Sequence, residues 1–188
     1  TGATRVARRM VVEVSFDGRD TRNDAVIAPR MIPESFDILL RETVAGYQRD
    51  ANVAVGPGTY LVICPNNTTV INNLEPLLDW RRRQGFNVVL ATTAETGTTN
   101  TGIKAWLQQQ YANLDPGLEY VVLVGDANGS VAIPTWSESY SGYGGEGDHD
   151  YTLLSGGDVL ADVHLGRLSV TSTTELANVV SKIVNYES

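Results

Sequence analysis

The sequence predicts an α/β fold, a three-layer αβα sandwich in which helices cover both faces of a doubly wound, roughly four-stranded parallel sheet. Two observations carry this prediction. From residue 59 onward, short apolar runs alternate with amphipathic stretches of helical period, the order that builds parallel strands joined by right-handed crossovers. The apolar runs are also hydrophobic at almost every position, as strands are when both faces of a sheet are buried.

The length and charge of the chain narrow the function classes. Its 188 residues suit one α/β domain with a short appendage, and 42% of them are hydrophobic, which is enough for a packed core. Lys and Arg number 14 against 22 Asp and Glu, a net charge of −8. Because this charge repels phosphate backbones and anionic lipids, we expect no nucleic-acid partner and no membrane partner.

The first 58 residues read differently from the rest. Residues 9–16 alternate between apolar and polar side chains as a half-buried strand does, and residues 38–47 favour a short helix. The strand has no obvious partner. We therefore predict a short, β-containing N-terminal segment over residues 1–58, followed by an α/β domain over residues 59–188.

The domain opens with a strand at residues 60–64, an unbroken apolar run that Pro65 and a polar cluster close. A helix follows and ends near Gly85, because its apolar residues recur at three- and four-residue spacing. These residues are Val70, Ile71, Leu74, Leu77 and Leu78. Residues 86–91 form the second predicted strand.

The same unit then repeats. A second helix carries an apolar stripe and ends at Pro116. The stripe consists of Ile103, Trp106, Leu107 and Tyr111. A third strand at 120–124 ends at Gly125 and Asp126, and a Gly-, Ser- and Tyr-rich insertion separates it from a fourth strand at 162–166. The closing helix begins at the capping-box spacing of residues 172–175.

Acidic residues suggest a cation site. Open parallel sheets bind ligands beyond the carboxyl ends of their strands, where Asp126 lies, and a later loop adds Asp158 and Asp162. The spacing of Ser155, Asp158, Leu160 and Asp162 mixes carboxylates with main-chain carbonyls, the oxygen ligands that calcium prefers. The alternative is an acidic loop that is merely solvated.

A cysteine nucleophile is not expected within this chain. Cys64 ends a buried strand, where a free cysteine usually behaves as a small apolar residue. His164 lies inside a predicted strand, and His149 lies in an acidic loop, flanked by Asp148 and Asp150. We therefore reject a Cys64–His149 catalytic dyad.

Several segments together resemble the gingipain family of cysteine peptidases, in order and nearly in spacing. They are residues 78–86, 103–107, 119–126, 162–169 and 185–187. The resemblance covers residues 59–188 and implies the first of two caspase-like α/β subdomains. The family's catalytic His and Cys lie in the second subdomain, so the resemblance implies no catalytic residue here. It also implies that the parent protein is a secreted or cell-surface zymogen that cleaves proteins or peptides.

The resemblance also implies which residues bind calcium and where the chain is cleaved. Carried over residue by residue, the family's structural calcium site takes carboxylates from Asp126, Asp158 and Asp162 and main-chain carbonyls from Ser155 and Leu160. The family has Glu where this chain has Asp162, and Tyr where it has Leu160. Residues 1–58 resemble the end of the family's prosegment, and Arg49 falls where arginine-specific members cut themselves.

Three hypotheses follow. In the first, the chain is the N-terminal subdomain of a gingipain-like endopeptidase, binds structural calcium and supports a C-terminal catalytic subdomain. In the second, it is a non-catalytic, calcium-stabilised binding or scaffold module of the same fold. A stand-alone, receiver-like domain is the third, but no Lys follows the fourth strand before the closing helix, as that class requires.

Overall fold

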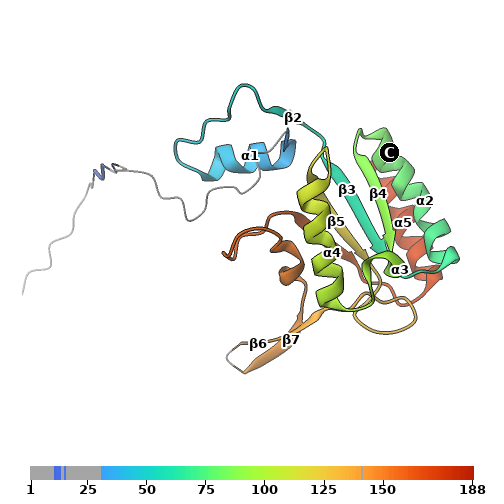
Figure 1. Ribbon diagram of the computed structural model, residues 1–188. Coiled ribbons are helices and arrows are strands. Elements are labelled where there is room, and N and C mark those ends of the chain that lie inside the picture. Colours follow the sequence, from blue (N-terminus) through green and yellow to red (C-terminus); the bar gives the residue numbers. More distant parts are fainter. Residues whose placement is uncertain (1–10, 14, 16–30, 141) are drawn as a thin grey trace, which may run out of the picture.

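The computed structural model describes residues 11–13, 15, 31–140 and 142–188. At its centre is a four-stranded parallel sheet with the strand order β4-β3-β5-β8 (Figure 1). The strands are β3 (Thr59–Cys64), β4 (Asn87–Thr92), β5 (Leu118–Val124) and β8 (His164–Leu168). The predicted α/β class and parallel sheet are therefore confirmed.

Helices cover both faces of the sheet. On one face α2 (Thr68–Arg83) packs against α5 (Thr173–Glu187), and on the other lies α4 (Asn100–Asn113) (Figure 1). A single turn, α3 (Thr93–Thr96), connects β4 to the segment before α4. This is the three-layer sandwich that the alternating sequence pattern predicts.

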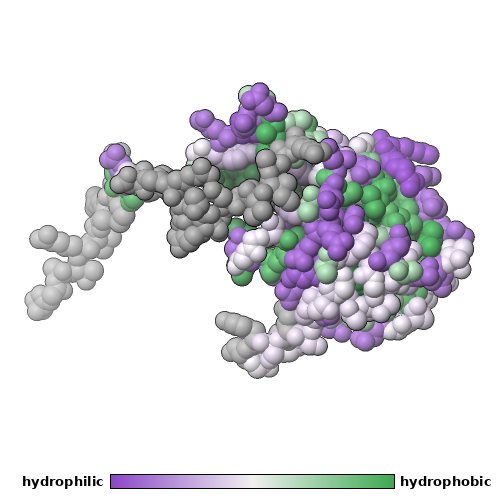
Figure 2. Space-filling view, in the orientation of Figure 1, coloured by the Kyte–Doolittle hydropathy of each residue, from purple (hydrophilic) through white to green (hydrophobic). Residues whose placement is uncertain are grey.

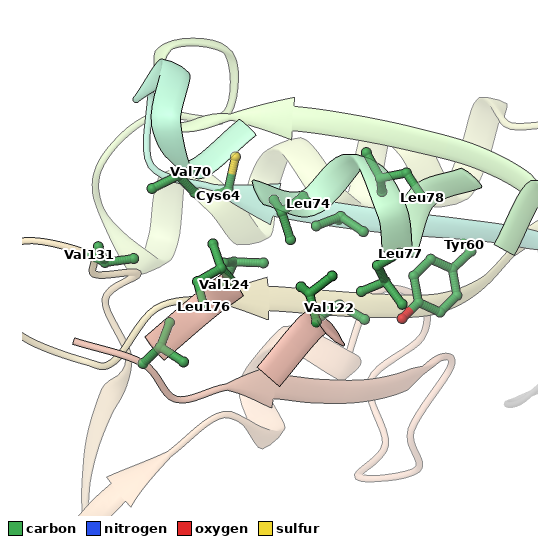
Figure 3. Close-up of a cluster of buried hydrophobic side chains, with 13 residues drawn as sticks. Tyr60, Cys64, Val70, Leu74, Leu77, Leu78, Val122, Val124, Val131 and Leu176 are labelled. Atoms are coloured by element: carbon green, nitrogen blue, oxygen red, sulfur yellow. The ribbon is translucent and has the colours of Figure 1, made fainter. Parts of the chain in front are cut away.

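The side chains of β3 divide the core in two. Tyr60, Val62 and Cys64 belong to a cluster under α2 and α5 (Figure 3). Leu61 and Ile63 belong to a second cluster under α4. Every residue of β3 is buried, and burial on both faces is the reason that this strand is almost wholly apolar.

Side-chain caps start the long helices. At α2, Asn67 Oδ1 accepts hydrogen bonds from the backbone N–H groups of Thr69 and Val70, at 2.9 and 3.2 Å. At α5, Ser172 Oγ accepts one from the N–H of Glu175. Each cap satisfies backbone donors that the first turn of a helix leaves free.

The N-terminal segment forms a small unit of its own beside the amino ends of the central strands. β1 (Met31–Pro33) and β2 (Ala54–Gly56) pair in parallel, joined by α1 (Glu34–Thr43). The helix predicted at 38–47 is α1, which begins earlier, directly after Pro33. Half of the strand predicted at 9–16 lies outside the described residues, and its described positions, 11–13 and 15, belong to no strand.

Two features of the second half of the chain differ from the predictions, namely the start of β8 and the structure of the insertion before it. β8 starts at His164 rather than at residue 162, because the Asp162 carboxylate accepts backbone hydrogen bonds within the preceding loop. The insertion before it contains an antiparallel hairpin of β6 (Trp136–Tyr140) and β7 (Tyr143–Gly147), followed by the 3-10 helix η1 (His149–Thr152). The hairpin projects away from the carboxyl edge of the sheet (Figure 1).

The surface of the domain mixes polar and apolar residues. In Figure 2, hydrophilic and neutral residues surround smaller apolar areas on the visible face, in keeping with a mean hydropathy of −0.12. Within the described ranges, no helix combines the length and the hydrophobicity needed to cross a membrane.

Candidate functional site at the carboxyl edge of the sheet

Gly125 turns the chain sharply at the end of β5. Its φ angle is +124°, in a region that L side chains rarely adopt. The segment that follows this turn passes very close to it, since a Cβ on Gly125 would lie 2.7 Å from the carbonyl oxygen of Val131. Only glycine meets both conditions, which explains the Val-Gly-Asp sequence at this position.

Asp126 is held by the same turn. Its backbone N–H donates to the carbonyls of Val131 and Val170, each at 3.1 Å, and its carbonyl accepts from Ile133 N–H at 2.9 Å. The side-chain Oδ1 accepts from its neighbour's backbone N–H at 2.8 Å and lies 3.3 Å from Ser169 Oγ. Asp126 is half-buried, and its hydrogen bonds stabilise the turn after β5.

Arg167 and Asp148 form a bidentate ion pair beside this turn. Nε of Arg167 donates to Asp148 Oδ2 and Nη2 donates to Oδ1, each at 2.7 Å. Nη1 donates to two backbone carbonyls, those of Gly125 at 2.9 Å and Ile133 at 2.8 Å. The side chains are 12% and 22% exposed, so the pair is largely withdrawn from water.

The pKa of Asp148 reflects this setting. Burial disfavours the carboxylate, but hydrogen bonds from Arg167 and Thr135 and the charge of Arg167 outweigh burial and hold the pKa of Asp148 below its ordinary value. Thr135 Oγ1 lies 2.7 Å from both Asp148 Oδ1 and the carbonyl of Gly147 and has one hydrogen to share between them. Asp148 therefore remains ionised at neutral pH.

Aromatic packing fastens the base of the hairpin. Trp136 meets Tyr151 of η1 edge to face, with ring centroids 4.5 Å apart. The buried Tyr151 hydroxyl donates to the carbonyl of Pro134 at 2.6 Å, and burial raises its pKa. The ammonium of Lys104 lies over the Trp136 ring, 5.9 Å from its centroid.

The five residues predicted to bind calcium are not brought together. Asp126 follows β5, whereas Asp158 and Asp162 precede β8. These strands run parallel and pair over five residues, so the pairing alone separates the two groups by about 13 Å, at about 3.3 Å per residue. Ligand oxygens lie about 2.3 to 2.6 Å from calcium, so Asp126 and Asp162 cannot share one ion.

Residues 155–162 stay together in one loop. Asp162 Oδ2 accepts from the backbone N–H groups of Leu154 and Ser155, each at 2.8 Å, and Asp158 Oδ1 accepts from the N–H of Leu160 at 2.8 Å. Over the described ranges, no three His, Cys, Asp or Glu side chains form a group that could hold a metal ion. Calcium here would need main-chain carbonyls for most of its ligands.

The geometry gives Cys64 no catalytic partner among the described residues. The side chain is fully buried, and burial, together with the charge of Glu95, raises the pKa of the thiol to about 12. Both histidines contact other groups, since His149 Nε2 lies 3.2 Å from the carbonyl of Val159 and His164 Nε2 lies 3.1 Å from Ser35 Oγ. At neutral pH Cys64 is a thiol, not a nucleophilic thiolate.

Sequence reasoning missed a polar cluster at the opposite, amino edge. Glu119 is 2% exposed; it accepts hydrogen bonds from Ser35 Oγ and from the backbone N–H of Gly58, the latter at 2.7 Å. Phe36 stacks on His164 with centroids 4.6 Å apart. A glutamate at the start of an otherwise apolar strand was the available signal. The cluster attaches α1 to the sheet.

Arg49, the predicted processing residue, lies in the loop between α1 and β2. The loop has no regular secondary structure at this position, and Arg49 is exposed. Exposed loops are the preferred sites of proteolytic cleavage. The geometry is compatible with cleavage, which stays a prediction.

Comparison with known proteins identifies relatives. Residues 54–188 match the family model described as Peptidase family C25. Lys-gingipain of Porphyromonas gingivalis is 28% identical over 97% of this chain and 11% of its own length. Gingipain R2 of the same organism is 24% identical over the whole chain and 25% of its own length.

Solved structures agree with this relationship. A structure described as that of a protease superposes with a TM-score of 0.62 at 25% identity, covering 79% of this chain and 31% of the other. A complex of the pro- and mature domains of RgpB from Porphyromonas gingivalis gives 0.59 at 25% identity, over 69% and 29%. The chain spans between a tenth and a third of these relatives. Together with the family match, these likenesses show that the chain belongs to peptidase family C25, the gingipain family of cysteine peptidases.

Proposed function

We propose that the chain is the N-terminal α/β subdomain of a secreted gingipain-like cysteine endopeptidase, and that it supports a catalytic subdomain supplied by the rest of the parent protein. The observation that carries this proposal is the state of Cys64. A family of cysteine peptidases needs a reactive thiolate, and the single cysteine of this chain is buried with a pKa of about 12. The reactive thiol therefore comes from another part of the parent.

The test compares this chain with its parent protein. The chain of residues 1–188 is expected to hydrolyse no peptide, whereas the parent hydrolyses peptides and keeps its activity after Cys64→Ala. Melting temperatures establish that each protein is folded. Loss of activity in a folded Cys64→Ala parent would refute the proposal. A parent sequence without a further Cys and His would favour the scaffold-module alternative instead.

We further infer that residues 1–58 are the end of a prosegment together with a linker, and that cleavage follows Arg49, so that residues 50–58 stay with the mature protein. The exposed loop supports this assignment. Sequencing the N-terminus of the mature parent tests it, with Asp50 expected as the first residue. Arg41→Ala, a change in the neighbouring helix, should leave the cleavage point unchanged, whereas Arg49→Ala should block it. A mature protein that starts far from Asp50 would contradict the assignment.

Calcium is proposed only for the loop of residues 155–162, without Asp126. Asp158 and Asp162 would each offer one carboxylate oxygen, and Ser155 and Leu160 would offer carbonyls. Calcium at 100 times its dissociation constant adds about 2.7 kcal/mol to stability, or about 5 to 11 °C in Tm for a chain of this size. Asp158→Asn should remove the shift, and Asp126→Asn should leave it. An equal Tm in calcium and in chelator would exclude the site.

A further inference from the structure

The guanidinium of Arg167 joins three segments that are far apart in the chain. Its N–H groups reach the carbonyl of Gly125 at the end of β5, the carbonyl of Ile133 before β6, and the carboxylate of Asp148 after β7. The sequence separations are 42, 34 and 19 residues. One side chain on β8 thus ties both ends of the insertion to the sheet.

The geometry of this junction is specific to arginine. Four hydrogen bonds of 2.7 to 2.9 Å diverge from one planar group. A lysine ammonium carries three donors on a single nitrogen and cannot form the two parallel bonds to a carboxylate. Arg167→Lys therefore keeps the charge but loses the shape of the junction.

The contacts that hold the described residues of the hairpin lie close to the Arg167 junction. A lone two-stranded hairpin is marginally stable in water, and three of the five residues of β7 are glycine. Among the described residues, its attachments to the domain gather near the base, where Trp136 packs on Tyr151 and Thr135 Oγ1 lies against Gly147 and Asp148. One more hydrogen bond joins Asn128 Nδ2 to Glu146 Oε1 of β7, at 3.3 Å. The ribbon extends outward from this base (Figure 1).

We propose that Arg167 is a positioning residue, which together with Asp148 holds the β6–β7 hairpin in the orientation that forms one wall of the peptidase's substrate cleft. This inference rests on the proposed function. The hairpin lies at the carboxyl edge, where open parallel sheets bind their ligands. A loosened wall weakens peptide binding and leaves the bond-breaking step unchanged, because no atom of Arg167 takes part in that step.

The first experiment measures amide hydrogen exchange on the full 188-residue chain. In Arg167→Lys and in Asp148→Asn, the amides of residues 136–147 should exchange at least tenfold faster than in the wild type, whereas those of β3 and β5 keep their rates. The matched control is Arg81→Lys, because Arg81 forms a bidentate pair with Glu187 at the opposite edge. Arg81→Lys should leave the hairpin amides unchanged. Unchanged hairpin exchange in both junction variants would overturn the proposal.

The second experiment measures peptide hydrolysis by the parent enzyme. Arg167→Lys should raise KM about tenfold with kcat within twofold of the wild type, and Arg81→Lys should leave KM unchanged. A loss confined to kcat would overturn the cleft assignment. If Arg167→Lys fails to fold, Asp148→Asn provides the same readout. A wild-type parent without peptidase activity would count against the proposed function alone, and the exchange experiment would still decide whether Arg167 holds the hairpin.

Discussion

Replacing Gly125 with alanine should destabilise the domain more than any other single-methyl change at the carboxyl edge. The new methyl group would meet two obstacles. The residue would retain a φ of +124°, and its Cβ would lie 2.7 Å from the carbonyl oxygen of Val131. That oxygen belongs to backbone that already accepts a hydrogen bond from Asp126 N–H, so it cannot move away without breaking the turn.

The expected cost follows from these two obstacles. A non-glycine residue in a sparsely populated backbone region costs about 1 to 3 kcal/mol, and a buried overlap costs about 1 to 3 kcal/mol. One backbone shift relieves part of both, so the sum of about 2 to 6 kcal/mol is an upper bound, and we expect a cost near its low end, about 2 kcal/mol. For a chain of this size, about 2 kcal/mol corresponds to a Tm decrease of about 4 to 8 °C.

Thermal and urea unfolding of the 188-residue chain measure this cost. Gly166→Ala is the matched control, because Gly166 lies in the adjacent strand, β8, and has no positive φ, and a methyl carbon added there would have no atom of the described residues within 4 Å. Gly166→Ala should change Tm by about 4 °C or less. If Gly125→Ala melts within error of Gly166→Ala, the account of the Val-Gly-Asp turn is refuted.

Three further predictions concern acid stability, thiol reactivity and the core. The pKa of Asp148 is lowered in the folded chain, so its stabilising contribution is present above the unfolded pKa of about 3.9 and is lost as the pH falls through the folded value. Between pH 5 and pH 3, Tm should therefore fall less in Asp148→Asn than in the wild type, and an equal fall would contradict this. Cys64, with its pKa of about 12, should react with a thiol reagent at pH 8 only after denaturant is added, so a rapid reaction of the native chain would show that its burial is misjudged. Leu107→Ala should lower the free energy of unfolding by about 2 to 5 kcal/mol, because Leu107 is fully buried, whereas Leu160→Ala, at a position 72% exposed, should change it by about 0.5 kcal/mol or less; urea unfolding that ranks them in reverse would contradict the core assignment.

The predicted elements that the structure confirms depend on local pattern. The strand β3 was predictable because six consecutive buried positions leave an apolar run that no surface segment has. The start of α5 was predictable because Ser172 and Glu175 cap it within one turn. Such signals lie within a few residues of one another, so the chain alone carries them.

The candidate site depended on information that spacing does not carry. Asp126 and Asp162 both border strands of the central sheet, but one follows its strand and the other precedes its own. The predicted strand at 162–166 already placed Asp162 at the amino end of a parallel strand, and the register of β5 and β8 turns that placement into a distance. The hairpin was hidden, because Gly and Ser predict a turn-rich insertion as readily as a ribbon.

By itself, the sequence determined the class of the fold, the order of its strands and helices, the apolar faces that form the core and the membership of a peptidase family. The tertiary structure decided which polar groups meet: Arg167 with Asp148 at one edge, and Glu119 with Ser35 at the other. The physical reason is that periodicity and capping act between neighbours in the chain, whereas each crossover of a parallel sheet brings together residues separated by tens of positions. Those contacts form only when all the strands are in register.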